Sequence, residues 1–307
     1  MIPARLVWII ISVLMALAVI GAAVLRLLPA SVLLNWAIAF GGGTALAVLA
    51  IALYRVRLEL QSSRRALNLA EAELGFARQV QQALLPAEFP AHSGLEFQAV
   101  CIPARGISGD YFDVFELSDG RVGIAIADIS GKGISAAILM ASLQALLRSV
   151  TDNEPDLRDV CRKLNHHFYR MTEASRFATF FYAEWCARNR TLKFVNAGHN
   201  LPITIGSCEQ VDWRSGGFPM GMFPSSQFEL GQASLKPGDV LLLYSDGITD
   251  LGESQGRNFG EARLREVLVQ NRHLALNELQ LKILNELEVW SNQEPEDDMT
   301  MVLIKTQ

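Results

Sequence analysis

Two long apolar runs near the N-terminus constrain this chain more than any other feature of its sequence. They extend over residues 6–28 and 32–54, with the short segment "LPAS" between them. Each run is at least about 20 residues long, which is the length that a membrane-spanning helix requires. A secretory signal peptide would not be followed at once by a second apolar run. The sequence therefore predicts a two-span transmembrane hairpin over residues 1–54.

Basic residues flank the predicted hairpin on both sides. Lys and Arg beside a span stay in the cytoplasm, so both ends of the hairpin, and the chain that follows it, are predicted to be cytoplasmic. These basic residues are Arg5, Arg55, Arg57, Arg64 and Arg65. The cysteines suit a reducing compartment and are expected to be buried thiols, because none has C-x-x-C spacing. They are Cys101, Cys161, Cys186 and Cys208.

A charged stretch rich in Ala and Leu follows the hairpin over residues 55–85. One set of its residues falls at alternating steps of three and four, the heptad spacing that favours a coiled coil. Two interpretations stay open: a signalling helix that pairs two chains through residues 58–85, or a single amphipathic helix packed on the following domain. The set consists of Leu60, Ser63, Leu67, Ala70, Leu74, Ala77, Gln81 and Leu84.

Residues 86–307 carry short strands in adjacent groups that are separated by pairs of helices. This grouping favours an α+β fold with antiparallel sheets over a regular βαβ alternation. The net charge of −5, without a basic patch, argues against nucleic-acid binding. We predict strands at 95–102, 111–117, 121–128, 177–185, 191–198, 201–206, 239–246 and 299–305, and helices at 135–150, 156–171, 261–270 and 275–290.

The loop after Asp128, in "IADISGKGISAAILM", admits three chemistries. A dinucleotide fold requires a second strand ending in an acidic residue about 20 positions later, where this chain has the helix end and turn "LRSVTDNEPDL". A P-loop requires Ser or Thr after Lys132, and Gly133 is there instead. A metal site that uses Asp128 remains, and Lys132 is then expected to be a solvated loop lysine.

Acidic residues lie at the ends of four predicted strands. They are Asp110, Asp128, Asp246 and the pair Asp297–Asp298. Carboxylates that a sheet brings together repel one another unless a cation neutralises them. Because their ligands are all oxygen atoms, hard ions such as Mg²⁺ or Mn²⁺ are the expected occupants.

Five ordered motifs give this chain a family resemblance: "SGDYFDVF", "ADISGKGISAAILMA", "NAGHNLP", "YSDGITD" and "DDMTMVLIK". Their order and spacing resemble the SpoIIE-like bacterial branch of the metal-dependent, type 2C-like (PPM) serine/threonine protein phosphatases, over about residues 75–307. The resemblance implies an antiparallel β-sandwich flanked by helices, with a phosphatase domain at 86–307. It also implies two divalent ions, Mn²⁺ or Mg²⁺, that activate a bridging water. The implied substrate is a small phosphorylated regulator of the anti-sigma-factor antagonist type.

The same resemblance implies a role for each acidic position. Asp128 would bridge both metals, with the Ile129 carbonyl as a neighbouring ligand. Asp246 and Asp297 would hold one metal, and Asp110 would serve the other. Asp128 and Asp110 are accordingly the candidate catalytic residues.

Further residues are assigned with alternatives. Arg105 is a candidate phosphate clamp, because a guanidinium matches phosphate in a bidentate manner, or else a surface arginine. Ser108 replaces the first of two glycines usual in the family, so reduced loop freedom is expected. Ser130 stands where the eukaryotic relatives carry a histidine acid, which leaves protonation of the leaving group to water. His199 is expected to serve a turn.

Together these features predict a phosphatase anchored in the bacterial inner (cytoplasmic) membrane by residues 6–54, with its catalytic domain in the cytoplasm. The alternative is a catalytically weak or inactive scaffold of the same fold that binds a phosphoprotein. All four acidic positions are present, which argues against that alternative.

Overall fold

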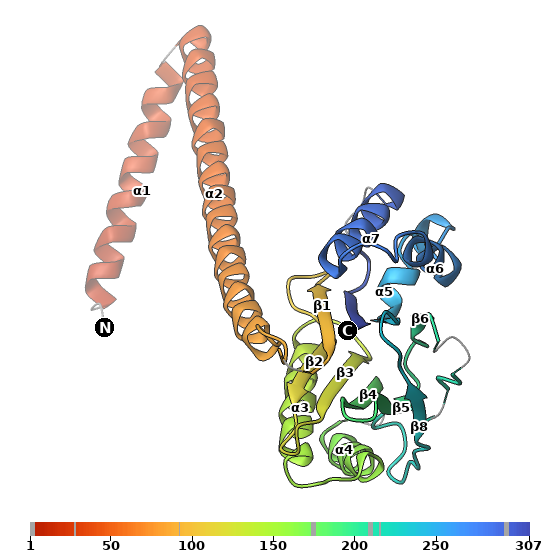
Figure 1. Ribbon diagram of the computed structural model, residues 1–307. Helices are drawn as coiled ribbons and strands as arrows, with labels where there is room; N and C mark the ends of the chain where they lie inside the picture. The colour runs from red at the N-terminus through yellow and green to blue at the C-terminus, as the bar shows by residue number, and fades with distance from the viewer. Residues whose placement is uncertain are drawn as a thin grey trace. The chain divides into compact units, whose positions relative to one another are not determined.

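The computed structural model describes residues 4–27, 29–91, 93–172, 176–207, 211–214, 216–291 and 295–307. The chain divides into two compact units, Met1–Glu71 and Ala72–Gln307, here called the N-terminal and the C-terminal unit. Figure 1 shows that the N-terminal unit is helical and that the C-terminal unit combines strands with helices. Of the predicted buried thiols, Cys161 is buried, whereas Cys101 and Cys186 are half-buried. Cys208 lies outside the described residues.

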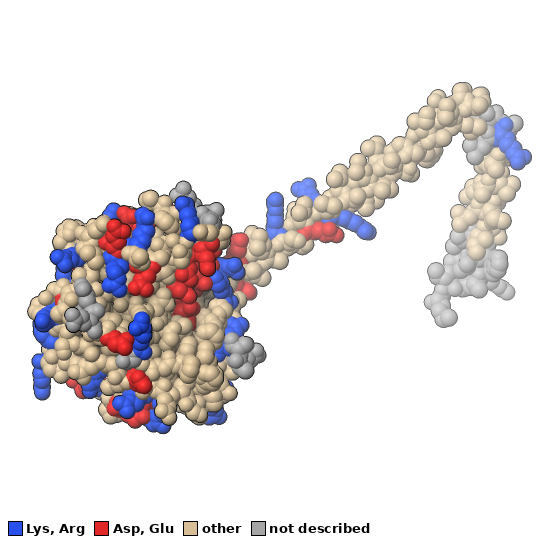
Figure 2. Space-filling model, turned by 90° about the vertical axis from the view of Figure 1, so that its right-hand side faces the viewer, with Lys and Arg blue, Asp and Glu red and all other residues tan. Residues whose placement is uncertain are grey.

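Two helices account for the chain up to residue 84. They are α1 (Ala4–Leu27) and α2 (Ala30–Leu84). Because α2 is continuous, the second apolar run and the predicted signalling helix belong to one element, without a break at residue 54. The first 25 residues of α2 carry no charged side chain, and Figure 2 shows that long uncharged stretch.

The length and apolarity of α2 are sufficient for a membrane span. The apolar stretch found in α1, Ile11–Val24, is shorter. A third apolar helix, α3 (Ile134–Thr151), also has sufficient length, but its buried face packs in the core of the C-terminal unit. Both membrane spans of the hairpin therefore stay predictions.

The C-terminal unit contains two packed sheets, which confirms the predicted α+β class. One sheet has the order β1 (Leu95–Ile102), β10 (Met299–Thr306), β9 (Val240–Tyr244), β6 (Ile203–Ile205). The other has the order β2 (Asp110–Glu116), β3 (Val122–Ile129), β4 (Ala178–Cys186), β5 (Thr191–Ala197), β7 (Gly216–Gly217), with β8 (Gly231–Ser234) also paired to β5. Among the described strands, only the β5–β7 pair is parallel. The prediction missed β7 and β8, because two to four residues carry no alternation to detect.

Helices cover both outer faces of this sandwich (Figure 1). Helices α3 and α4 (Leu157–Met171) pack on the β2–β3–β4–β5 sheet, and α6 (Glu261–Gln270) and α7 (Leu276–Trp290) pack on the other. Short elements α5 (Asp246–Thr249) and η1 (Glu253–Gln255) follow β9. Strand β3 shows how alternation builds these layers, since Ile124 and Ile126 point between the sheets while Ala125 and Ala127 face the helices.

The predicted heptad stripe divides into two parts on α2. Leu74, Ala77 and Leu84 are half-buried and Gln81 is buried, all within the C-terminal unit. The earlier members, Leu60, Ser63, Leu67 and Ala70, are exposed. The last part of the stripe therefore packs on its own chain, and chain pairing through the exposed part stays a prediction.

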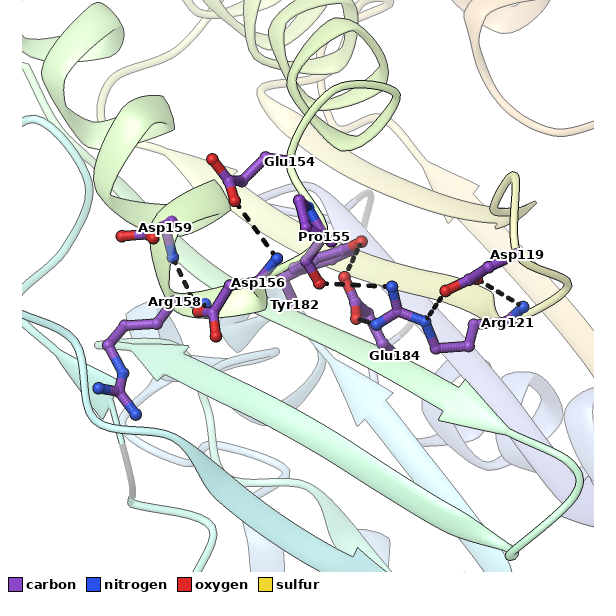
Figure 3. A network of polar contacts seen from close by, with 9 residues as sticks. All are labelled: Asp119, Arg121, Glu154, Pro155, Asp156, Arg158, Asp159, Tyr182 and Glu184. Carbon is purple, nitrogen blue, oxygen red and sulfur yellow. Dashed lines mark hydrogen bonds and ion pairs between the residues drawn. The ribbon is translucent and has the colours of Figure 1, made fainter.

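A polar network surrounds Arg121 at the start of β3 (Figure 3). Its guanidinium pairs with Glu184, which is only 3% exposed, and with Asp119 at 2.7 Å. Tyr182 donates to the other Glu184 oxygen at 3.1 Å. Since this network lies at the opposite end of β3 from Asp128, it stabilises the sheet and does not belong to the acidic cluster.

Candidate active site

Asp110 and Asp128 are Cα partners in the β2–β3 pairing. Alternate strand residues share a face. Asp110 is therefore on the same face of β2 as Phe112, and Asp128 is on the same face of β3 as Ile126, and both of these apolar side chains lie between the sheets. Both therefore lie where the sandwich interior opens at its end. Asp110 is 2% exposed, and its Oδ2 has no hydrogen-bond partner among the described residues. A buried carboxylate oxygen without a partner calls for a proton or a cation.

The acidic residues raise one another's pKa values. Burial, followed by the charge of Asp128, raises the pKa of Asp110 well above its usual value. The pKa of Asp128 is raised to about 7 by burial, followed by Asp246 and Asp297. Burial is also the largest cause of the raised pKa of Asp246. The cluster therefore holds negative charge that the fold alone does not neutralise. On the face drawn in Figure 2, acidic side chains gather along one stretch of the C-terminal unit.

Asp246 is the first residue of α5, directly after the buried Ser245 that follows β9. A cavity of about 120 Å³ lies beside it, lined by Lys132, Asp246, Gly247, Asp250, Leu251, Glu253, Glu296 and Asp297. A Cβ atom on Gly247 would overlap the Asp298 carbonyl oxygen. The glycine therefore allows the start of α5 to pack directly on the segment that carries Asp297.

Asp297 is paired with Lys132, contrary to the expectation of a solvated lysine. The Lys132 ammonium lies 2.7 Å from Asp297 Oδ2 and donates to the Glu296 carbonyl at 2.9 Å. The two side chains are 43% and 45% exposed. Lys132 thus places positive charge inside the acidic cluster, and it lowers the pKa of Asp128 against the larger raising effects.

Asp298 has a role that the sequence did not reveal. Its Oδ1 accepts a hydrogen bond from the Ala104 N–H at 2.8 Å, and its Oδ2 accepts from the Gly109 N–H at 2.6 Å. Asp298 therefore holds the loop between β1 and β2, which leaves Asp297 as the more open acid of the pair. The family resemblance implied a metal-binding role for Asp297 alone of this pair, and the role of Asp298 depends on contacts that are distant in the sequence.

Of the two arginines near the acidic segments, only one contacts a loop backbone. Arg105 is exposed, and its guanidinium has no hydrogen bond or ion pair with the described residues. Arg176, which the sequence analysis missed, donates to the Ser130 carbonyl at 3.3 Å and lies against Gly131, whose φ is +97°. It comes from the segment before β4, so no local pattern links it to the Asp128 loop.

His199 matches the predicted turn role. Its backbone N–H donates to Asn196 Oδ1 at 2.8 Å, and the Asn196 amide donates back to the His199 carbonyl at 3.0 Å. The ring nitrogen Nδ1 lies 2.8 Å from Thr179 Oγ1. Burial lowers the pKa of His199 to about 4, so the neutral ring is favoured near pH 7 and the imidazolium form that would act as a general acid is not.

The residues present fit a hard divalent cation in donor type and in charge. The donors are carboxylate oxygens, to which the Ile129 carbonyl, close to Gly109, can be added. The unpartnered oxygen of Asp110 and the raised pKa values of three acids point to a missing positive charge. Within the described ranges, however, no three acidic, histidine or cysteine side chains lie close enough together to enclose an ion as they stand.

The two largest of the cavities found lie elsewhere in the C-terminal unit. Their volumes are about 430 and 560 Å³, and they share a lining of Ser225, Ser226 and Gln227. None of the acidic residues predicted from the sequence lines either cavity. We therefore place the candidate site at the acidic segments, where Asp246 and Asp297 line the smaller cavity and Asp110 pairs with Asp128 at the ends of β2 and β3.

Comparisons with known proteins identify the family of the C-terminal unit. Residues 118–307 match the family described as Stage II sporulation protein E (SpoIIE). Protein IcfG of Synechocystis is 33% identical over 69% of this chain, and the phosphoserine phosphatase RsbU of Bacillus subtilis is 26% identical over 76%. The matches span 37% of the length of IcfG and 70% of that of RsbU.

A solved structure shows the same fold. The SiaA-PP2C domain of Pseudomonas aeruginosa superposes with a TM-score of 0.65 at 18% identity, over 79% of this chain and 98% of that domain. The two sheets agree with this fold, and the family match over more than half of the chain establishes the classification. The chain belongs to the family described as Stage II sporulation protein E (SpoIIE), and its C-terminal unit has the fold of a PP2C domain.

Proposed function

We propose that this protein is a membrane-anchored, metal-dependent serine/threonine protein phosphatase. The observation that carries the proposal is the pair Asp110 and Asp128, two adjoining carboxylates at the mouth of the sandwich, one of them with an unpartnered buried oxygen. Family membership supports the same activity, as does the printed name of RsbU, a phosphoserine phosphatase.

Four carboxylates and one carbonyl of this chain would hold two divalent ions, Mn²⁺ or Mg²⁺. These are Asp110, Asp128, Asp246, Asp297 and the carbonyl of Ile129. When bound, such ions lower the pKa of a water molecule and neutralise charge that develops on the phosphoryl oxygens. Asp128, which pairs with Asp110 and whose pKa is raised by Asp246 and Asp297, would be a ligand of these ions.

The reaction is hydrolysis of a phosphoserine or phosphothreonine ester. A water oxygen forms a bond to phosphorus, the bond from phosphorus to the side-chain oxygen breaks, and that oxygen takes up a proton from water. The neutral His199 supplies no proton, and Ser130 occupies the position after the Asp128–Ile129 pair. Arg105, which is exposed and makes no hydrogen bond or ion pair with the described residues, would bind the phosphate oxygens, as guanidinium groups do well.

We propose as the substrate a small phosphorylated regulator of the anti-sigma-factor antagonist type, as the family resemblance implies. The apolar residues 6–54 would anchor the protein in the bacterial inner membrane by two spans, with the C-terminal unit in the cytoplasm. Residues 58–85 would pair two chains through the exposed part of the heptad stripe. A mass measurement in detergent that finds only monomer would refute this pairing.

The activity is tested with the full chain purified in detergent. Hydrolysis of a generic phosphate ester and of a phosphoserine peptide is measured with Mn²⁺, with a chelator, and for the variant Asp128→Asn. Asp152→Asn, which changes an exposed aspartate, is the matched control. We expect activity that requires Mn²⁺ and Asp128 but not Asp152. An inactive protein that still binds a phosphoprotein would instead support the scaffold alternative.

A further inference from the structure

Gln81 is a buried polar residue of α2, and the residues on either side of it in the sequence are exposed to solvent. It is 7% exposed, whereas Gln82 beside it is exposed. Its carboxamide makes two hydrogen bonds to one residue: Nε2 donates to the Ser108 carbonyl at 2.7 Å, and Oε1 accepts from the Ser108 N–H at 2.8 Å. Both backbone groups of the buried Ser108 are therefore satisfied by a side chain 27 residues earlier in the chain.

The three residues that lead into β2 are each held at the backbone N–H by a side chain. Ser108 is held by Gln81, Gly109 by Asp298 at 2.6 Å, and Asp110 by the Ser108 hydroxyl at 2.9 Å. Ser108, expected only to reduce loop freedom, thus also supplies an acceptor that fixes Asp110. The chain of contacts runs from Gln81 through Ser108 to the carboxylate with the unpartnered buried oxygen.

We infer that Gln81 is a positioning residue of the active site, which fixes the backbone before Asp110 and thereby the direction of its carboxylate. The inference rests on the proposed metal-dependent function. Without the carboxamide, a buried donor and a buried acceptor of Ser108 would lose their partners. The backbone would then shift towards other partners, and displacements of about 1 Å in a catalytic site cost on the order of 100-fold in activity.

A positioning role differs from a merely structural one in what it perturbs. Loss of a contact that only stabilises the fold lowers the stability of the whole C-terminal unit. Loss of a positioning contact acts first on the 103–110 loop and on the metal that Asp110 serves. Two local readouts therefore decide between them: amide hydrogen exchange in residues 103–110, and the Mn²⁺ concentration that gives half-maximal activity.

The test uses the full chain in detergent with three variants. Gln81→Leu removes both hydrogen bonds at similar volume, and Gln81→Glu keeps the acceptor for the Ser108 N–H while it loses the donor. Gln82→Leu is the matched control on the same helix. Hydrolysis of p-nitrophenyl phosphate is titrated with Mn²⁺, exchange is followed by mass spectrometry without metal, and thermal unfolding is recorded for each protein.

For Gln81→Leu we expect a half-saturating Mn²⁺ concentration raised about 10-fold or more, faster exchange confined to residues 103–110, and partial recovery of activity at high Mn²⁺. We expect Gln81→Glu to lie between this variant and wild type, and Gln82→Leu to match wild type. If Gln81→Leu does not fold, Gln81→Glu provides the same comparison.

Wild-type exchange and wild-type Mn²⁺ saturation in both Gln81 variants would overturn the inference. Faster exchange spread evenly over the C-terminal unit would also overturn it, since loss of a purely structural contact would have that effect. A wild-type protein without any response to Mn²⁺ would refute the metal-dependent function, and the inferred role with it. That failure shows in the wild-type titration alone, before any variant is compared.

Discussion

Asp110 and Asp128 stand opposite each other in the β2–β3 register, so a strand pair that forms the core of the fold also brings two carboxylates together. This arrangement costs stability in the absence of a cation, because burial raises the pKa of both groups, the charge of Asp128 raises that of Asp110, and the charges of Asp246 and Asp297 raise that of Asp128. Retention of such a pair lowers the stability of the fold in favour of function. Unfolding measurements with and without a cation test this effect on stability.

The effect of Asp128→Asn on the free energy of unfolding should change sign when Mn²⁺ is added. Without metal, the variant removes a repelled, partly buried charge and should be more stable than wild type by about 1–2 kcal/mol. With Mn²⁺, wild type gains binding energy that the variant cannot gain, so the order should invert. Thermal unfolding with chelator and with Mn²⁺ checks this, with Asp152→Asn as the control. A variant less stable than wild type under both conditions would contradict the account of the cluster.

Acid should destabilise the protein through His199. Its pKa is lowered to about 4 in the folded state and returns to about 6.5 on unfolding. The stabilising contribution of the neutral ring is therefore complete above pH 6.5 and is lost as the pH falls towards 4. Full loss amounts to on the order of 3 kcal/mol. Denaturant unfolding between pH 7 and pH 4 checks this, and His199→Gln should flatten the slope. An unchanged slope in that variant would refute the assignment.

Arg121→Ala should destabilise the protein without altering its chemistry. The substitution leaves Glu184 buried and without its cation, and the loss of one member of a buried ion pair costs about 3–5 kcal/mol. Arg158, which uses only its backbone N–H in the same network, is the control: Arg158→Ala should change stability by less than about 0.5 kcal/mol. The Mn²⁺ dependence of activity at low temperature should match wild type. A shifted Mn²⁺ dependence would connect this network to the site.

Gly247→Ala should damage both the fold and the site. The added Cβ overlaps backbone of the Asp298 segment, which cannot rotate away as a side chain could. Overpacking of this kind costs about 1–3 kcal/mol, and here it displaces the start of α5, which carries Asp246. Gly75→Ala is the control, because it lies in α2 with open space around it and should be neutral or slightly stabilising. Equal effects of the two substitutions in unfolding and activity assays would contradict the close approach.

The parts of the fold that follow from local pattern could be predicted from the sequence. Strand β3 and helix α6 lie within two residues of their expected bounds, because alternation and periodicity report burial directly. The acidic segments were also identified, since each follows or precedes a recognisable strand. The boundary predicted at residue 54 does not coincide with a break in the helix, because α2 continues through it.

Roles that depend on distant contacts could not be read in this way. Gln81 occupies a heptad position and was assigned to a seam, but its partner Ser108 lies in the C-terminal unit. Asp298 looks equivalent to Asp297 until the N–H groups of Ala104 and Gly109 are seen to point at it. Periodicity predicts which face of a helix or strand is buried, but it does not predict which polar group on another element that face contacts.

The central claim is that the acidic segments of this chain form a site for two divalent ions. Its most direct test is to count the Mn²⁺ ions bound at equilibrium by the full chain in detergent, for wild type and for Asp128→Asn. The account predicts two ions per chain in wild type and a loss of binding in the variant. Absence of tight binding in wild type, or equal binding in the variant, would contradict it.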